Sequence, residues 1–504
     1  MTSPPLEGLQ DNTALNSPPP EGQESLNAPF NEQKYRDLLE RLEVSELMKS
    51  ELERTERIDS EFYIKRNLQI ITFIKQRKFL KLTEITHVSD GNHMSISDDF
   101  IDTGIPYYRG QDIHNFFIEN ASPICISEKT YEKPVLQRSH LKKNDILLSI
   151  VGTIGKIALV STNKKATCSC KLAILRPKGN MSSELLSMFL LGKYGQNQIR
   201  KFIRGAVQMG LILEDMDQLF VPAFSKTFDY HISSKVNLSK ELTEKSKTLY
   251  RQAEELLLET IGIGRDAMHC VSTNSTKYNI KSFRESFLTT GRLDAEYYQP
   301  KYEEIIDKVK NQPHEILGNL VAIKKSIEPG SDVYADEGLP FIRVSDYNKL
   351  GISTPEKCLS DRFCKENATL LQSLYLTKDT ILFSKDGSVG IACMVSENMQ
   401  AITSGAILHL TVKDKTKILP EYLTLVLNSE VVKLQAERDA GGSIILHWRV
   451  SEIENVVVPV IDYETQRQIA ELIEKSFCLR GESERLLEEA KDMVEKEIEA
   501  VTAY

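Results

Sequence analysis

A short stretch near residue 110 combines side chains that can pair with nucleic-acid bases. It reads Tyr107-Tyr108-Arg109-Gly110-Gln111-Asp112, and an equivalent stretch later in the chain contains Arg343, Ser345 and Asp346. Arginine can donate two parallel hydrogen bonds to guanine, and glutamine can pair with adenine in a similar bidentate way. The stretch therefore predicts contacts with base edges. The alternative, that the tyrosines are core residues and Arg109 is a surface charge, stays open at this point.

Two glycine-containing turns could bring the backbone close to phosphate groups. The first contains Gly152, Thr153 and Lys156, and the second contains Ser388 between Gly387 and Gly390. Glycine permits a close approach of the backbone, and backbone N–H groups can bind phosphate. Ordinary turns between strands would have the same sequence, so both interpretations remain open.

Further cationic and amide side chains complete the candidate interface. Lysine and arginine neutralise phosphates and release the counterions bound to them. A solvent-exposed helix face is the competing explanation for the same residues. Trp448 aligns with Leu211, so we expect it in the core and not stacked on a base. The candidates are Lys171, Arg200, Lys201, Arg204 and Gln208 in the first half of the chain, and Lys385, Arg438, His447 and Arg449 in the second.

No stretch of the sequence carries a known catalytic motif. Residues 150–157 resemble a phosphate-binding loop, but Ile150 replaces its first glycine and Ile157 replaces the serine or threonine that holds magnesium. The metalloprotease, serine-hydrolase and dinucleotide-binding patterns are absent from the sequence, as is the Asn/Asp-Pro-Pro-Tyr stretch of amino-methyltransferases. We expect a non-catalytic protein that itself binds no cofactor and no metal.

The distribution of charge argues against tight nucleic-acid binding by this chain alone. The formal net charge is −9. Residues 75–225 contain 20 Lys and Arg against 14 Asp and Glu (+6), whereas residues 312–462 contain 15 against 20 (−5). Because phosphate contacts supply most of the non-specific affinity for DNA, the sequence favours a reader that borrows positive charge from a partner.

Composition also predicts the cellular location of the protein. The eight cysteines are scattered and form no Cys-x-x-Cys pair, so we expect reduced, buried thiols. No apolar run approaches the ~20 residues of a membrane span, and the proline-rich, acidic N-terminus does not resemble a signal peptide. These features predict a cytoplasmic protein without a membrane partner.

The chain is a tandem duplication. Arg57-Ile-Asp-Ser-Glu-Phe-Tyr63 recurs as Arg292-Leu-Asp-Ala-Glu-Tyr-Tyr298. Residues 141–155 recur at 376–390, Val221-Pro222 recurs as Val458-Pro459, and Glu244-Lys-Ser246 recurs as Glu474-Lys-Ser476. The offsets, 230 to 237 residues, are too long for a solenoid repeat, so each copy is a whole domain with its connecting segment.

Long amphipathic helices follow both copies of the domain. Apolar residues recur at helical spacing from Leu238 to Leu257 and from Ile469 to Ile498. We expect the two stripes to pack on each other as an antiparallel coiled coil; the alternative is that each packs on its own domain. Shorter predictions are strands at 146–151 and 381–384, helices over 183–204 and 420–438, and a helix within 31–56.

These elements predict an α+β fold with two pseudo-repeated mixed α/β domains separated by long antiparallel helices. A helix over 240–262 would span ~35 Å and one over 464–500 would span ~55 Å. The first length is close to the ~34–36 Å turn of B-DNA, so domains at the ends of such helices would meet half-sites about one turn apart. The expected segments are a disordered tail (1–30), an N-terminal helical region (31–74), a first domain (75–225), a central helical spacer (226–311), a second domain (312–462) and a C-terminal helix (463–504).

Over residues 43–500 the chain resembles the specificity subunits of Type I restriction–modification systems. The resemblance rests on the duplicated Arg-x-Asp-x-x-x-Tyr stretch, the Leu-Leu/Phe-Ser…Gly-x-x-Gly pair, Gly205-Ala-Val-Gln208 before Val-Pro, and the helix after each domain. The second copy departs from the pattern, because Gly442-Ser-Ile-Ile445 lacks the glutamine.

The resemblance implies two target-recognition domains, each reading one half of a split double-stranded DNA sequence. It also implies docking of two methyltransferase subunits that carry S-adenosylmethionine, with restriction (motor nuclease) subunits as further partners. Two alternatives remain at this stage. One is a protein-interaction scaffold that never contacts DNA, and the other is the recognition module of an atypical or fused restriction–modification enzyme.

Overall fold

The largest sheet of each half of the chain has four antiparallel strands in the same order. The computed structural model describes residues 31–40, 42–50, 52, 57–121, 123–205, 209–263, 278–442 and 445–500; the tail expected to be disordered (1–30) lies outside them. The strands expected near 146 and 381 are confirmed as central members. The two sheets are β2 (Thr86–Asp90), β9 (Leu172–Pro177), β6 (Ile146–Ser149), β7 (Ile157–Leu159), and β12 (Val321–Lys325), β21 (Ile407–Val412), β18 (Ile381–Ser384), β19 (Ala392–Met394).

A second four-stranded sheet is also repeated, with one parallel pair at its edge. In the large sheets, the central strands β6 and β18 are fully buried and consist almost entirely of apolar residues, as buried strands require. The second sheets are β3 (Phe100–Ile101), β5 (Ile124–Ile126), β4 (Ile105–Tyr108), β8 (Thr167–Cys168), and β13 (Tyr334–Ala335), β17 (Lys357–Leu359), β14 (Leu339–Ile342), β20 (Ile402–Thr403).

A short antiparallel pair joins the start of each domain to its end. β1 (Phe79–Lys81) pairs with β10 (Phe220–Pro222), and β11 (His314–Ile316) pairs with β22 (Val457–Pro459). A buried glutamine holds each closing strand. Gln198 donates to the carbonyl of Phe220 (2.9 Å) and accepts from its N–H (2.8 Å). Gln435 makes the same two bonds with Val457, at 3.0 and 2.8 Å.

The helical segment of each domain is broken in two, where one helix was expected. α6 (Ser183–Leu191) and α7 (Lys193–Lys201) meet at Gly192, and α15 (Pro420–Asn428) and α16 (Glu430–Asp439) meet at Ser429. Both junction residues are extended, with ψ of 166° and 160°. Because a serine adopts the same conformation as the glycine, the break follows from the packing of the domain and not from glycine alone.

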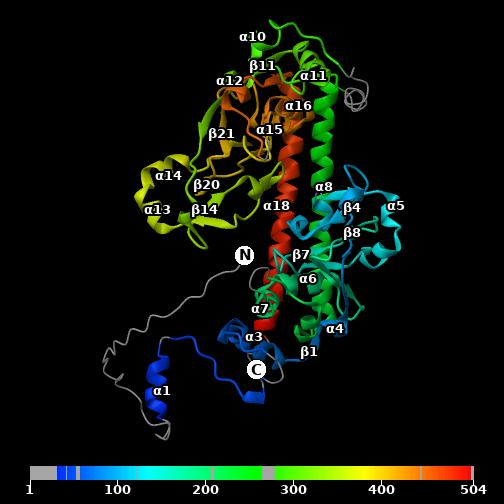
Figure 1. The fold of residues 1–504 in the computed structure, drawn as a ribbon, viewed down its shortest axis with the longest axis vertical. Coiled ribbons are helices and arrows are strands. Elements are labelled where there is room, and N and C mark those ends of the chain that lie inside the picture. Colours follow the sequence, from blue (N-terminus) through cyan, green and yellow to red (C-terminus); the bar gives the residue numbers. More distant parts are fainter. Residues whose placement is uncertain are drawn as a thin grey trace, which may run out of the picture.

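Two long helices form the antiparallel coiled coil that the sequence predicts, α8 (Lys226–Thr260) and α18 (Tyr463–Ala500) (Figure 1). α8 begins earlier than expected, because Ser225 caps it by accepting from the N–H of Phe228. Its 35 residues span ~52 Å. The buried positions alternate in steps of four and three residues, the spacing of a coiled-coil seam: Ile232, Val236, Ser239, Thr243, Ser246, Tyr250, Ala253 and Leu257.

The middle of the coiled coil is lined by hydroxyl groups. Ser239 Oγ contacts Ser483 Oγ at 2.7 Å, and Ser246 Oγ contacts Ser476 Oγ at 2.9 Å. Ser476 lies 237 residues after Ser239, and Ser483 lies 237 residues after Ser246. The two contacts are therefore related by a local twofold symmetry. The match of Ser246 to Ser476 made from sequence was therefore wrong by one heptad, because successive heptads present the same pattern.

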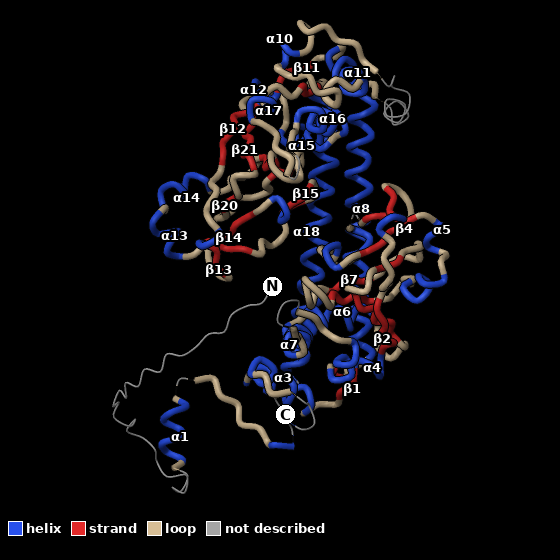
Figure 2. The backbone as a smooth tube through the Cα atoms, viewed as in Figure 1, coloured by secondary structure: helices blue, strands red, loops and turns tan. Residues whose placement is uncertain are grey.

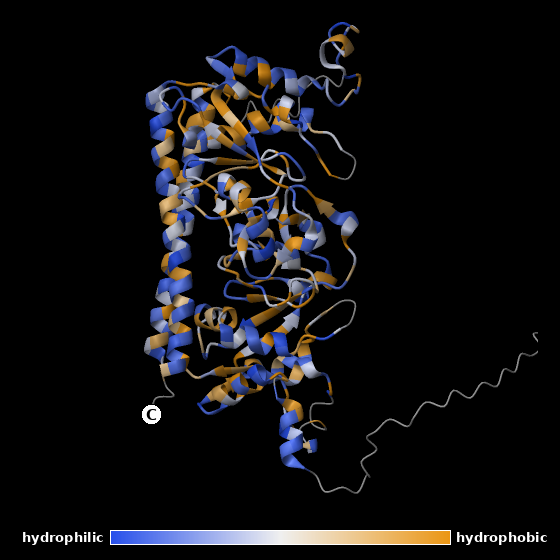
Figure 3. Cartoon of the chain, turned by 90° about the vertical axis from the view of Figure 1, so that its left-hand side faces the viewer, coloured by the Kyte–Doolittle hydropathy of each residue, from blue (hydrophilic) through white to orange (hydrophobic). Residues whose placement is uncertain are grey.

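The two domains lie as separate groups of strands beside the helix pair (Figure 2), and a side view shows both on one side of it (Figure 3). The helix expected within 31–56 is interrupted, since α1 covers Glu32–Leu39, residues 43–48 have no regular structure, and residues 49, 50 and 52 are helical again. The remaining helices and strands are α3 (Lys65–Lys75), α4 (Leu82–Ile85), α5 (Glu128–Tyr131), α10 (Phe287–Thr290), α11 (Pro300–Lys310), α12 (Leu317–Leu320), α13 (Asp361–Glu366), α14 (Ala368–Leu374), α17 (Val450–Ile453), β15 (Tyr347–Asn348) and β16 (Gly351–Ile352).

The described cysteines are all free thiols, but few are buried. Only Cys168 and Cys393 are fully buried, and Cys478 is exposed on α18. The expectation of generally buried thiols was therefore wrong, because Cys125 and Cys358 lie in short, partly exposed strands, Cys170 lies in a turn, and Cys364 and Cys478 lie on helix surfaces. No described helix combines the length and apolar character needed to cross a bilayer.

Candidate nucleic-acid interface

Three loops of the first domain meet at one end of its large sheet. The turn after β4 contacts the β6–β7 loop, where Thr153 Oγ1 donates to the carbonyl of Gly110 at 3.2 Å. The β8–β9 turn joins them through the Ile150 N–H, which donates to the carbonyl of Lys171 at 3.0 Å. A bridge between Val151 and Gly210 adds the segment after α7. Candidate residues far apart in sequence thus lie close together.

The second domain repeats this convergence. The N–H of Lys385 donates to the carbonyl of Ala406, and the N–H of Trp448 donates to the carbonyl of Lys385, both at 2.8 Å. Asp386 and His447 are bridged as Val151 and Gly210 are in the first domain. Trp448 is 1% exposed and packs near Phe383, which confirms the expected core position.

Two glycines at the tips of these loops have a backbone conformation that other residues rarely adopt. Gly152 has φ of 81° and Gly387 has φ of 76°, and both are exposed. A Cβ at either position would meet nothing within 4 Å. The glycines are therefore required by the tight turn itself, and the turn leaves Thr153 and Ser388 exposed at the same tips.

Each domain holds one candidate arginine with an aspartate three residues later. Arg109 donates from Nε to Asp112 Oδ2 at 3.2 Å, and Arg343 donates in the same way to Asp346 at 3.3 Å. The aspartates are buried, whereas the arginine side chains are about one third exposed (33% and 34%). Each guanidinium is therefore oriented by the carboxylate and still faces solvent in part.

The two tyrosines before Arg109 lie in the core. Tyr107 and Tyr108 belong to β4 and are 5% and 3% exposed. Burial raises the pKa of both phenols. Their rings offer almost no surface to a ligand, which matches the core alternative. The neighbouring Gln111 is exposed and remains the amide candidate of this turn.

The cations of the first domain divide into surface and packed residues. Lys171 and Arg200 are exposed, and Arg204 is exposed but forms an ion pair with Asp215. Lys201 is buried, with its Nζ 3.9 Å from the centre of the Phe62 ring. Gln208 lies outside the described residues.

Most polar candidates of the second domain are tied to an acidic neighbour. Lys385 and His447 both pair with Asp386, His447 through Nδ1 at 2.8 Å. Arg438 forms two bonds to Asp439, at 2.6 and 2.9 Å. The side chains of Ser345, Ser388 and Arg449 lie on the surface.

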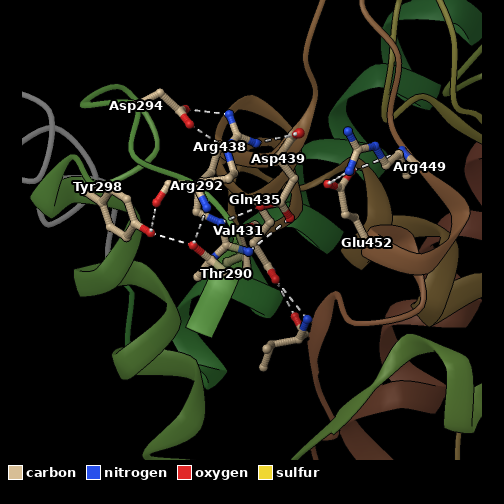
Figure 4. Close-up of polar contacts among 11 residues, drawn as sticks. Thr290, Arg292, Asp294, Tyr298, Val431, Gln435, Arg438, Asp439, Arg449 and Glu452 are labelled. Atoms are coloured by element: carbon tan, nitrogen blue, oxygen red, sulfur yellow. Dashed lines mark hydrogen bonds and ion pairs between the residues drawn. The ribbon is translucent and has the colours of Figure 1, made fainter. Parts of the chain in front are cut away.

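Each Arg-x-Asp-x-x-x-Tyr stretch packs as a clamp against the second helix of its broken pair, α7 or α16, and Figure 4 shows the second copy. Arg292 pairs with Asp294 and donates to the carbonyl of Asp439 at 3.3 Å, and the hydroxyl of Tyr298 donates to the carbonyl of Arg292 at 3.1 Å. The Arg292 guanidinium lowers the pKa of the Asp294 carboxyl.

In each clamp, one aromatic ring lies between two cations. Tyr297 is 4.5 Å from Arg292 and 5.2 Å from Arg438, and in the first copy Phe62 lies near Arg57 and Lys201. Lys201 and Arg438 are 237 residues apart and occupy equivalent places. Packing against the aromatic ring explains why both copies have a cation at this position, so a contact with DNA is not needed to explain it.

Sequence reasoning missed the acidic residues of the site. Asp215, Asp386 and Glu356 each pair with a candidate cation. Glu356 is the most unusual, because it accepts from Lys156 of the first domain across the boundary between the domains, at 3.1 Å. No group of three His, Cys, Asp or Glu residues within the described part of the chain could hold a metal ion.

Comparison with known proteins identifies the second domain. Residues 316–481 match the family model described as "Type I restriction modification DNA specificity domain". The chain carries a Type I restriction–modification specificity domain. The first domain repeats the strand order and closing glutamine of this specificity domain, so the two are copies of one unit.

Solved structures similar to the chain include specificity subunits. The Type I restriction–modification S subunit from M. genitalium is 14% identical (84% of this chain, 92% of that chain, TM-score 0.34). The HsdS subunit from Thermoanaerobacter tengcongensis is 15% identical (84% and 95%, TM-score 0.27). The type IIG restriction endonuclease BpuSI is 11% identical (67% and 42%, TM-score 0.20). No curated protein matches the chain significantly.

Proposed function

We propose that this chain is the DNA sequence-specificity subunit of a Type I restriction–modification complex. Each domain reads one half of a bipartite target in double-stranded DNA, and the coiled coil sets the distance between the halves. The observation that carries the proposal is the duplicated convergence of loops, with Arg109, Gln111 and Lys171 in one copy and Arg343, Ser345 and Arg449 in the other.

The arrangement of the two domains supports reading of one duplex. Both domains project from the coiled coil in the same direction in the side view (Figure 3), although they lie on its opposite flanks in the front view (Figure 1). A single duplex that crosses the coiled coil can therefore contact both. The copies differ in sequence at the loops, as the recognition of two different half-sites requires. Phosphate contacts would orient the duplex, and exposed side chains at the loop tips would reach base edges.

The chemistry of methylation and cleavage belongs, in this proposal, to partner subunits. Two methyltransferase subunits that bind S-adenosylmethionine dock on this chain, and restriction subunits join as further partners. The acidic second domain supports this division, because a chain with net charge −9 gains affinity for DNA when partners contribute cations.

The test is a comparison of DNA binding with and without the cognate methyltransferase. We expect weak retention of duplex DNA by the chain alone and a gain in affinity when the methyltransferase is added. That gain should shrink as salt is raised, because it depends on phosphate contacts. Absence of any gain would contradict the proposal and favour a scaffold that does not contact DNA.

A further inference from the structure

One ion-pair network crosses the boundary between the two domains. Lys156 Nζ, at the end of the β6–β7 loop, lies 3.1 Å from Glu356 Oε1, just before β17. The other oxygen of Glu356 lies 3.5 Å from the NH2 group of Arg343, after β14. One carboxylate thus joins a candidate DNA-binding cation of the first domain to one of the second.

This network is not a by-product of the duplication. The residue equivalent to Lys156 in the second copy, 235 positions later, is Ile391, which cannot form an ion pair. The network therefore has no counterpart at the equivalent position of the second copy. A feature present in one copy only needs an explanation other than the shared fold.

The electrostatics show why the carboxylate holds both cations. Lys156, followed by Arg343, lowers the pKa of Glu356, so the carboxylate is charged at neutral pH. Its two oxygens face two different cations, as two oxygens of a phosphate group would. His114 lies in the same region, and burial followed by the charge of Lys156 lowers its pKa, so it adds no positive charge there at neutral pH.

We propose that Glu356 occupies the place of a DNA phosphate in the free protein, and that duplex DNA displaces it. In the absence of DNA, Glu356 masks Lys156 and Arg343 and joins the two domains at their recognition loops. When DNA enters, the phosphates take over both cations and the carboxylate turns to solvent. This inference rests on the proposed function, because it assumes that the loops receive DNA.

The exposure of the network suits a contact that opens readily. The side chain of Glu356 is 60% exposed, and those of Lys156 and Arg343 are about one third exposed. Ion pairs this open to solvent are weak and are screened by salt. Binding of a polyanion therefore overcomes the contact at small cost, while the cations stay oriented until DNA arrives.

Three single substitutions test the proposal in the complex with methyltransferase, with a labelled random-sequence duplex as the probe. Glu356→Gln should bind the duplex roughly two- to fivefold more tightly than the unmodified chain at low salt, and Lys156→Gln should bind it less tightly. The control is Glu366→Gln, which removes the same charge from the same domain but pairs only with Arg362, at similar exposure. The control should change affinity far less than Glu356→Gln.

The opposite signs separate the proposal from a purely structural bridge. A bridge that only holds the domains together would make Glu356→Gln and Lys156→Gln change affinity in the same direction, and that result overturns the inference. Equal affinities for Glu356→Gln and Glu366→Gln also overturn it. If the unmodified chain binds DNA but either of these two results is found, the inference about Glu356 fails and the proposed function stands. If it fails to bind even with methyltransferase, the proposed function and this inference fall together.

Discussion

The length of the coiled coil should set the gap between the two halves of the DNA target. The central heptads of the two helices, residues 240–246 and 477–483, lie opposite each other around the hydroxyl contacts. Duplicating both heptads keeps the spacing of buried positions and lengthens the pair by seven residues, or ~10 Å at 1.5 Å per residue. At 3.4 Å per base pair, the gap should grow by about three base pairs.

A longer insertion checks the helical phase of the same argument. Three base pairs turn the second half-site by ~100° around the duplex, since a turn contains 10–10.5 base pairs. Three duplicated heptads add ~31 Å, about nine base pairs, and bring the half-site nearly back to its original face. We therefore expect slower methylation with one added heptad than with three.

Single-molecule sequencing of methylated DNA from cells that express each variant gives the gap directly. A heptad added to α8 alone is the matched control, because it misaligns the two helices and should lower thermal stability without giving a wider gap. The reasoning is refuted if both paired insertions leave the gap between half-sites unchanged.

Three further outcomes follow from the structure. Gln435→Leu should lower the free energy of unfolding by about 2–4 kcal/mol in urea titrations, because it leaves the buried N–H and carbonyl of Val457 without partners; a change below 1 kcal/mol would contradict this. Burial lowers the pKa of His409 to about 4. Because this histidine is protonated in the unfolded chain before it is protonated in the folded one, the free energy of unfolding should fall by at most about 3 kcal/mol as pH drops from about 6.5 to 4. The same pH dependence in His409→Gln would exclude this histidine as the cause. Lys171→Ala should weaken binding to all duplexes alike and reduce the salt slope by about one, whereas Arg438→Ala should lower the melting temperature more than the affinity, and the reverse pattern would assign Arg438 to the DNA contact.

The sequence predicts the repeated parts of the fold because duplication makes weak signals reinforce each other. The strands near 146 and 381 and the two apolar stripes recur at nearly the same offset (235 and 237 residues), so each copy supports the other. The sequence places the start of α8 too late, because its cap, Ser225, resembles any loop serine. The one-heptad error at Ser246 has a similar cause, since neighbouring heptads are alike.

The candidate site could be predicted only in part. Gln111, Lys171 and Arg200 are exposed, as the sequence predicts for candidate DNA contacts. Two other candidate cations are not available in the same way, because Lys201 is buried and Arg438 pairs with Asp439. Which cation faces solvent depends on the aromatic ring and the carboxylate beside it, and these come from distant segments. The contact between Lys156 and Glu356 joins residues 200 positions apart and leaves no trace in local sequence.

Modular reading by two domains is tested most directly by replacing one of them. Residues 75–225 would be exchanged for the equivalent domain of a related protein, with the coiled coil and the second domain unchanged, and the methylated motif would be sequenced in cells. The account predicts that one half of the motif changes while the other half and the gap stay the same. A motif in which both halves change, or neither does, would contradict it.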